Sequence, residues 1–277
     1  MINTHTHLIL LTLTMLAASA SAQETTPQQT SQNTNAKPPL EITADDTLEW
    51  FRSEQKIIAR GNARATQEGS SIEATTLSAN YRDGAQGRFE ISQLNADNNV
   101  VIRAQNSTAY GDNAVYNLDQ ELATMTGNNL RMISPDQTVT ARDRFEYHVV
   151  EGKLIAIGNA VAIRPNKNGG QDKLNADTIS AIFKENAQGE RVLETLEANG
   201  NVTITTPTEK ITGTYGIYRA STNKAEIQGG VTITRGPNIL QGQRAEVDLD
   251  TNKSRIFGGG NTNSGRVKAV FYPGSDE

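Results

Sequence analysis

A strand pattern centred on a glycine–asparagine pair runs Leu154-Ile155-Ala156-Ile157-Gly158-Asn159-Ala160-Val161-Ala162. Five further copies of this pattern occur along the chain. Their central pairs are Gly61-Asn62, Asn98-Asn99, Gly127-Asn128, Gly200-Asn201 and Gly229-Gly230. A pattern that recurs in this way predicts a fold built from repeated strands.

Apolar residues flank each pair at alternate positions. Before the pairs stand Ile57 and Ala59, Leu94 and Ala96, Ala123 and Met125, Leu154 and Ala156, Leu196 and Ala198, and Ala225 and Ile227. After the pairs stand Ala63 and Ala65, Val100 and Ile102, Leu130 and Met132, Ala160 and Ala162, Val202 and Ile204, and Val231 and Ile233. The residues between them are mostly polar, as at Arg60, Arg64 and Thr203. Because successive side chains of a strand point to opposite faces, we expect one face of each strand to be buried.

The inward positions are unusually small. Ten of these 24 residues are alanine. Two sheets about 10 Å apart cannot be filled to the density of a protein core by methyl groups alone. Either larger side chains elsewhere complete the core, or the fold leaves space for an apolar ligand in a slot as long as a strand, about 26 Å for nine residues.

Each of these strands is followed by a turn and a second alternating segment, as at Val139 and Ala141 or Leu174 and Ala176. Successive second segments are 29 to 37 residues apart, a spacing typical of repeat architectures. No convincing helical period is present after the N-terminal segment. The sequence therefore predicts an all-β fold of about six strand-turn-strand units.

Composition excludes several classes of function. The 277-residue chain has a formal charge of −5, few aromatic residues (5%) and no cysteine. It therefore lacks the basic surface of a nucleic-acid-binding protein, and it cannot form disulfides or thiolate metal sites.

The N-terminus resembles an export signal. An apolar run from Leu8 to Ala18 precedes Ala20-Ser21-Ala22, and we expect a signal peptide at 1–22 with cleavage after Ala22. The run is shorter than the roughly 20 residues that span a bilayer. No Lys or Arg precedes it, so an uncleaved anchor is the alternative.

The rest of the chain divides by composition. Residues 23–39 are polar and rich in Pro, Gln and Thr, which predicts a disordered linker. The β-domain should span 40–257, with Trp50-Phe51 anchoring its core. Residues 258–277 should form a Gly-rich hinge and a last edge strand that contains Val267, Ala269 and Phe271.

Catalytic and metal-binding patterns are weak. His148 is the only histidine beyond the signal segment, so histidine-based activation of a nucleophile has one candidate without a neighbouring motif. The turn at Asp248 imitates a calcium loop, but Lys253 and Gly259 stand where glycine and glutamate are required. We expect a protein that is not an enzyme and has no metal site and no cofactor.

A family resemblance joins these features. The segments Leu40-Glu41-Ile42-Thr43-Ala44-Asp45 and Ile57-Ile58-Ala59-Arg60-Gly61-Asn62-Ala63, followed by the recurring Gly-Asn strands, resemble the OstA-like domain of the LptA family of lipopolysaccharide-transport bridge proteins. The ending Gly265-Arg266-Val267-Lys268-Ala269-Val270-Phe271-Tyr272-Pro273 is similar to the ending of such proteins. The resemblance covers residues 39–273.

The resemblance implies a twisted β-jelly roll in the periplasm that encloses the acyl chains of lipopolysaccharide. Implied partners are an inner-membrane anchored LptC-type protein at the N-terminal edge and an outer-membrane LptD-type translocon at the C-terminal edge. Head-to-tail self-association is a further option, and a nucleic-acid partner is not expected. The chain is longer than the compact family pattern.

Pattern and resemblance together predict a set of lipid-binding residues. They are Leu40, Ile42, Ile57, Leu94, Val100, Ile102, Met125, Leu130, Met132, Leu154, Leu196, Val202, Ile204, Ile227, Val231 and Ile233. Two alternatives stay open: a membrane-anchored or outer-membrane partner of the same pathway, and a β-solenoid that acts as an adhesin or on polysaccharide.

Overall fold

A computed structural model gives the fold of the chain. It describes residues 39–84, 89–104, 107–135, 137–165, 170–187, 191–248, 250–251, 253–259 and 265–272. The predicted signal peptide, and the predicted linker apart from Pro39, lie outside the described residues, as does most of the predicted glycine-rich hinge.

Eighteen strands make one antiparallel sheet. They are β1 (Glu41–Thr43), β2 (Thr47–Phe51), β3 (Lys56–Gln67), β4 (Ser70–Asp83), β5 (Phe89–Ala104), β6 (Ser107–Asn117), β7 (Leu122–Thr126), β8 (Arg131–Ser134), β9 (Gln137–Thr140), β10 (Arg144–His148), β11 (Lys153–Pro165), β12 (Gln171–Glu185), β13 (Arg191–Thr205), β14 (Lys210–Arg219), β15 (Lys224–Arg235), β16 (Asn238–Asp248), β17 (Lys253–Phe257) and β18 (Lys268–Val270). A short 3₁₀ helix, η2 (Ala220–Thr222), links β14 to β15.

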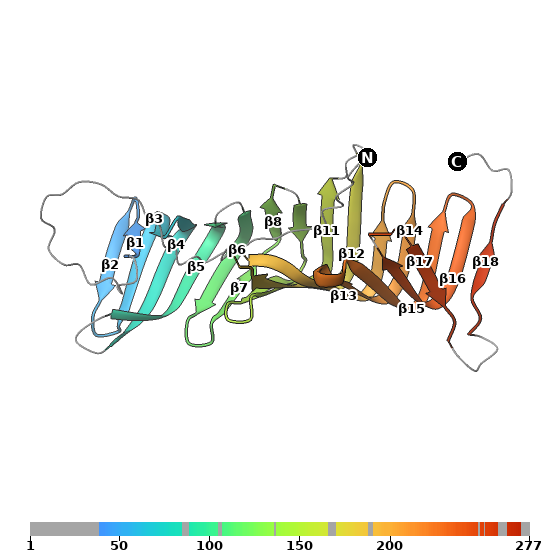
Figure 1. Ribbon diagram of the computed structural model, residues 1–277. Helices are drawn as coiled ribbons and strands as arrows, with labels where there is room; N and C mark the ends of the chain where they lie inside the picture. Colours follow the sequence, from blue (N-terminus) through green and yellow to red (C-terminus); the bar gives the residue numbers. More distant parts are fainter. Residues whose placement is uncertain are drawn as a thin grey trace, which may run out of the picture.

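The strands lie side by side along an elongated molecule, with β1 and β2 at one end and β18 at the other (Figure 1). The predicted all-β class is confirmed, whereas the jelly-roll description stays a prediction. A β-solenoid of the parallel β-helix type is wrong for the described strands, because their pairings, such as β3–β4, β5–β6 and β12–β13, are antiparallel.

The glycine–asparagine pairs form β-bulges. Between Ile157 and Ala160 the register of β11 against β12 shifts, so that Gly158 and Asn159 lie opposite one residue of the partner strand. Both have positive φ, +89° and +45°. Glycine and asparagine adopt this left-handed conformation more readily than other residues. Equivalent shifts occur in β3, β5, β13 and β15.

A bulge bends its strand, so the row of bulges divides the sheet into two arms. Arm A contains residues 56–60 of β3, the part of β4 that pairs with them, the part of β5 that pairs with that part of β4, and so on from strand to strand as far as β17. Arm B contains residues 63–67 of β3 and the parts of the following strands that pair on from them in the same way, as far as β18. The long strands run through both arms. The short strands belong to one arm each: β2, β7, β10 and β17 to arm A, and β1, β8, β9 and β18 to arm B.

The third pattern copy departs from the predicted continuous strand. Gly127-Asn128 is followed by an additional Asn129, and the chain breaks into β7 and β8 there. The chain is also interrupted between β9 and β10. These four short strands still pair with one another, β7 with β10 and β8 with β9, so the sheet continues through the middle of the molecule.

Only the two ends of the sheet present strands paired on one side. β1 and β2 pair with β3 alone, and β17 and β18 pair with β16 alone, among the described strands. The predicted core anchor is wrong for this reason. Trp50 and Phe51 lie on edge strand β2 with 48% and 36% of their surfaces exposed, because no further strand covers them.

Candidate functional site

The two arms face each other across an apolar interior. A small pocket near the N-terminal end is lined by residues from both arms. Arm B contributes Ile42 and Ile72, and arm A contributes Ile57, Leu77 and Leu94. Since side chains from the two sides of the bend line one space, the two arms enclose apolar space at this end of the predicted slot.

Alanines line the bend of this slot. Ala63, Ala96 and Ala160, each beside a bulge, are completely buried. The arms converge at the bend, so small side chains are required there by close packing. The alanine excess in the sequence therefore comes partly from the bend, and the open space lies farther from it, among the larger Ile and Leu side chains.

Burial divides the predicted lipid-binding residues into two sets. The buried set is Val100, Met125, Leu130, Met132, Leu154, Val202, Ile227, Val231 and Ile233. The half-buried set is Leu40, Ile42, Ile57, Leu94, Ile102, Leu196 and Ile204. The half-buried set therefore offers side-chain surface that the protein itself does not cover, whereas the buried set is covered almost completely by protein.

Protein side chains fill the interior beside the bend in the middle of the molecule. A Cβ added to Gly111 of β6 would lie 2.6 Å from Met125 Cγ and 3.1 Å from Leu130 Cδ2. Both side chains therefore pack directly on the backbone of β6. Leu130 is 2% exposed, so we expect it to support the slot more than to touch a ligand.

One core runs through the middle of the molecule. The buried residues of its cluster extend from Ala59 in β3 to Val202 in β13. Phe145 and Tyr147 of β10 belong to the same cluster. A second cluster around Ile227, Val231 and Ile233 continues the apolar face toward the C-terminal edge.

Arm A carries a row of aromatic residues, of which only Trp50 was singled out from the sequence, as a core anchor. Register pairs Ile57 with Trp50, Leu94 with Tyr116, Leu154 with Tyr147 and Leu196 with Tyr218. The signal that could have found them is their place on strands directly opposite the inward apolar row. We name Trp50, Tyr116, Tyr147 and Tyr218 the aromatic row.

The aromatic row has a polar side. Tyr218 donates a hydrogen bond to Asn223 Oδ1 at 3.0 Å, Arg191 donates to the Tyr147 hydroxyl, and Trp50 donates to the Tyr81 hydroxyl at 2.8 Å. Burial raises the pKa of Tyr147 against the opposing effect of Arg191. An aromatic ring with one apolar side and one polar tip suits the boundary between an apolar slot and water.

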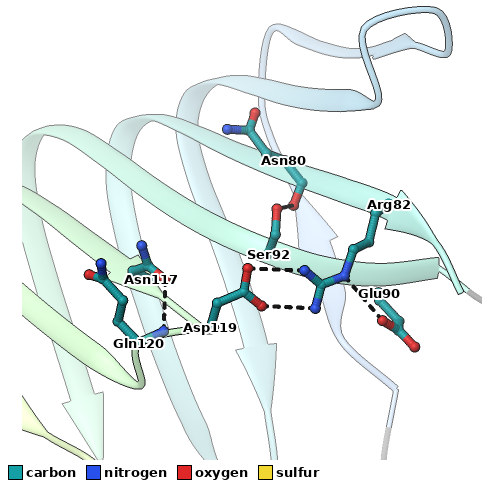
Figure 2. Close-up of polar contacts among 7 residues, drawn as sticks. All are labelled: Asn80, Arg82, Glu90, Ser92, Asn117, Asp119 and Gln120. Atoms are coloured by element: carbon teal, nitrogen blue, oxygen red, sulfur yellow. Dashed lines mark hydrogen bonds and ion pairs between the residues drawn. The ribbon is translucent and has the colours of Figure 1, made fainter.

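A polar network joins the strand ends of arm A near the N-terminal pocket. Figure 2 shows Arg82 of β4 between Glu90 of β5 and Asp119 of the turn after β6. Arg82 donates to Asp119 at 3.0 and 2.8 Å and to Glu90 at 3.2 Å. These contacts tie three neighbouring strands together at the rim of the slot.

The outer face of the sheet carries charged side chains that pair with one another. Glu73 lies between Arg64 at 3.1 Å and Arg103 at 2.7 Å, and the guanidinium of Arg131 stacks on Tyr110 at 4.1 Å. Exposed pairs of this kind add little to stability. Their consequence is a solvated outer face opposite the apolar inner one.

The described part of the chain shows neither a metal-binding cluster nor a membrane-spanning helix. It holds no group of three or more His, Asp or Glu side chains placed to bind a metal. His148 lies in β10, with Nε2 3.8 Å from Glu146 Oε2. None of the described helices is long and apolar enough to span a membrane.

No curated protein sequence matches the chain. Among solved structures, the crystal structure of LptH, the LptA homologous periplasmic component of the conserved lipopolysaccharide transport device from Pseudomonas aeruginosa, matches at 11% identity and a TM-score of 0.21, covering 85% of this chain and 96% of that one.

The family model for the LptA/(LptD N-terminal domain) LPS transport protein matches the chain twice, over residues 41–153 and 143–253. The two matched segments meet at β10, in the middle of the continuous sheet. Together they cover the strands from β1 to β16. The chain therefore belongs to the LptA/LptD N-terminal domain family of LPS transport proteins.

Proposed function

We propose that the protein is a periplasmic lipopolysaccharide-binding transport protein, and that its slot shields the acyl chains of lipid A on their way from the inner to the outer membrane. Family membership supports transport of lipopolysaccharide. The single observation that carries the shielding role is the pocket between the arms, which is lined mainly by apolar side chains from both.

The tandem arrangement supports a bridging role. Two matched segments in one chain share one sheet and one core, so one subunit presents an apolar face about twice as long as one segment alone would. A longer face lets acyl chains travel farther without contact with water, which reduces the cost of exposing apolar surface. The chain performs no chemistry in this proposal and acts without a cofactor.

The two sheet edges are the proposed docking sites for partners. β1 and β2 would accept an LptC-type strand, and β18 with β17 would accept an LptD-type strand or a second copy of this chain. Unpaired strand edges bind other chains through main-chain hydrogen bonds. Exposed apolar side chains accompany both edges, Trp50 at the first and Phe271 at the second.

A charge substitution inside the slot tests lipid binding. Ile204→Glu would place a carboxylate on the inner face, at a cost of several kcal/mol unless the group is protonated. Thr203→Glu, one residue away, points outward and is the matched control. We expect lipopolysaccharide binding by the purified mature protein to be lost in Ile204→Glu alone. Normal binding by a folded Ile204→Glu protein would refute the proposal.

The mature N-terminus distinguishes the proposed periplasmic protein from the alternative of a membrane-anchored partner. A periplasmic bridge would begin at Gln23 after signal cleavage, whereas an anchored partner would retain the apolar segment. Mass spectrometry of the native protein distinguishes the two.

A further inference from the structure

Polar side chains line the inner face of arm B in the middle of the molecule. They are Ser107 of β6, Ser134 of β8, Gln137 of β9, Arg164 of β11 and Asp172 of β12. Register pairs Ser134 with Gln137 and Arg164 with Asp172.

Strand alternation places these side chains inside the slot. Gln137 stands two residues from Val139 and Ser134 two residues from Met132, and Val139 and Met132 belong to the buried core. Residues two apart share a face of the strand. The polar row therefore lies between the apolar wall and the rim of the slot.

Two members of the row are buried without partners. Gln137 is 3% exposed and Ser107 is 5% exposed. The Ser107 hydroxyl and both polar atoms of the Gln137 amide have no hydrogen-bond partner among the described residues. Because such groups carry a desolvation cost and nearly all buried polar groups in native proteins are satisfied, their presence points to a polar ligand group.

Neighbouring charges are already neutralised. Arg164 and Asp172 form an ion pair at 2.8 Å, with 17% and 24% of their side chains exposed. Arg164 also acts across the slot: burial raises the pKa of Tyr218 on arm A, and the Arg164 guanidinium opposes that effect. The unpaired groups of the row, Ser107 and Gln137, are neutral.

Gln137 differs in chemistry from the residue at the equivalent position of the first segment. It stands 21 residues before Gly158, as Leu40 stands 21 residues before Gly61. The equivalent position is therefore apolar at the N-terminal edge and an amide in the middle of the sheet. Strand pairing does not require an amide at this position, since β1 pairs with β3 in the same manner through Ile42 and Ala65.

We propose that Gln137 and Ser107 form a polar subsite inside the slot that binds a hydroxyl group carried on the acyl chain of a bound lipid. The inference rests on the proposed lipid-binding function. The amide supplies two donors and an acceptor, and the serine hydroxyl supplies one donor and two acceptor lone pairs. An apolar slot with such a subsite holds a hydroxylated chain in one register, whereas a plain chain slides freely.

A pair of fatty acids tests the subsite. Calorimetry would compare a saturated fatty acid with its β-hydroxy analogue of equal chain length on the full-length mature protein. We expect the hydroxylated acid to bind about tenfold more tightly, the effect of one additional hydrogen bond in a buried site. Gln137→Met should abolish this preference, and Ser107→Ala should reduce it. Gln241→Met, on the exposed face of β16, should leave it unchanged.

Stability separates a ligand site from a structural amide. Because Gln137→Met removes unpaired polar atoms, the Tm of the ligand-free protein should stay equal or rise. A clear fall in Tm would mean that Gln137 is structural and would overturn the inference. Equal binding of the two acids by wild type would overturn it as well.

Failure of the proposed lipopolysaccharide-binding function would give a different result from failure of the subsite. With intact lipopolysaccharide binding, the subsite alone is rejected if the wild-type protein shows no hydroxyl preference, if Gln137→Met retains that preference, or if neither acid binds. Absence of lipopolysaccharide binding rejects the proposed function.

Discussion

At the scale of single residues, the bulges depend on a repeated set of contacts. Asp45 N donates to Gly61 O at 2.8 Å, and Arg142 N donates to Gly158 O at 2.7 Å. An aspartate side chain lies against the glycine in each segment, Asp46 in the first and Asp143 in the second. The bend of the slot is thus held by the same geometry twice.

A glycine substitution tests the bend. Gly61 has φ +80°, and an added Cβ would lie 2.3 Å from Asp46 Oδ2. Gly69 has φ +77° with nothing within 4 Å. We expect Gly69→Ala to lower the free energy of unfolding by about 1 kcal/mol through backbone strain alone. Gly61→Ala should lower it by about 2 to 4 kcal/mol, because the aspartate must also move. Urea denaturation measures both.

A double variant identifies the cause of that difference. If the clash with Asp46 is responsible, Asp46→Ala should lessen the effect of Gly61→Ala in a double-mutant cycle. Equal destabilisation by the two glycine variants would show that the close approach is unimportant.

At the scale of elements, the period-two pattern predicted the strands and their inner face, but it could not follow the faces through the bend. In β4, Ala74 and Leu77 are both buried although they are an odd number of residues apart. The bulge in β3 matches two of its residues with one of β4, so the alternation of β4 shifts there. Strict alternation would have placed Leu77 outside.

The local sequence pattern also cannot show which strands lie at the edges of the sheet, or which distant strands pair with each other. Trp50 is as apolar as a core residue, and only its position on an edge strand leaves it exposed. The unpaired state of Gln137 depends on β6, β8 and β11 coming together from separate parts of the sequence. A short polar segment such as Gln137–Thr140 gives no sign of this by itself.

Proline at an edge strand tests docking. Ile42→Pro in β1 and Ala269→Pro in β18 alter strands that pair on one side only, so folding should be largely retained. We expect each variant to lose complex formation with its own partner domain in size-exclusion chromatography. Ala225→Pro in β15, which pairs on both sides, should instead unfold the protein. Unchanged complexes of both edge variants would argue against edge docking.

At the scale of the whole molecule, the two matched segments behave as one body. β10, in the overlap of the two segments, pairs with β7 of the first and β11 of the second, and β9 of the first pairs with β11 of the second. One buried cluster crosses these pairings. Cooperative unfolding is expected when the boundary between two units is packed as tightly as the units themselves.

Equilibrium unfolding tests this cooperativity. Trp50 is the only tryptophan in the chain and reports on the first segment. Its fluorescence transition in guanidinium should coincide with the far-UV circular dichroism transition of the whole sheet. A Trp50→Phe/Tyr218→Trp variant moves the reporter into the second segment and should give the same midpoint after allowance for its own stability. Separate transitions would mean that the segments fold independently.

One apolar slot between the arms should hold acyl chains in both segments. Site-specific photo-crosslinking to lipopolysaccharide measures it most directly. Probes at Ile102 in the first segment and Ile204 in the second should both capture lipid, because both side chains are half-buried on the inner face. Probes at the outward neighbours Arg103 and Thr203 should capture none. Equal crosslinking on the two faces, or capture in one segment alone, would contradict a continuous slot.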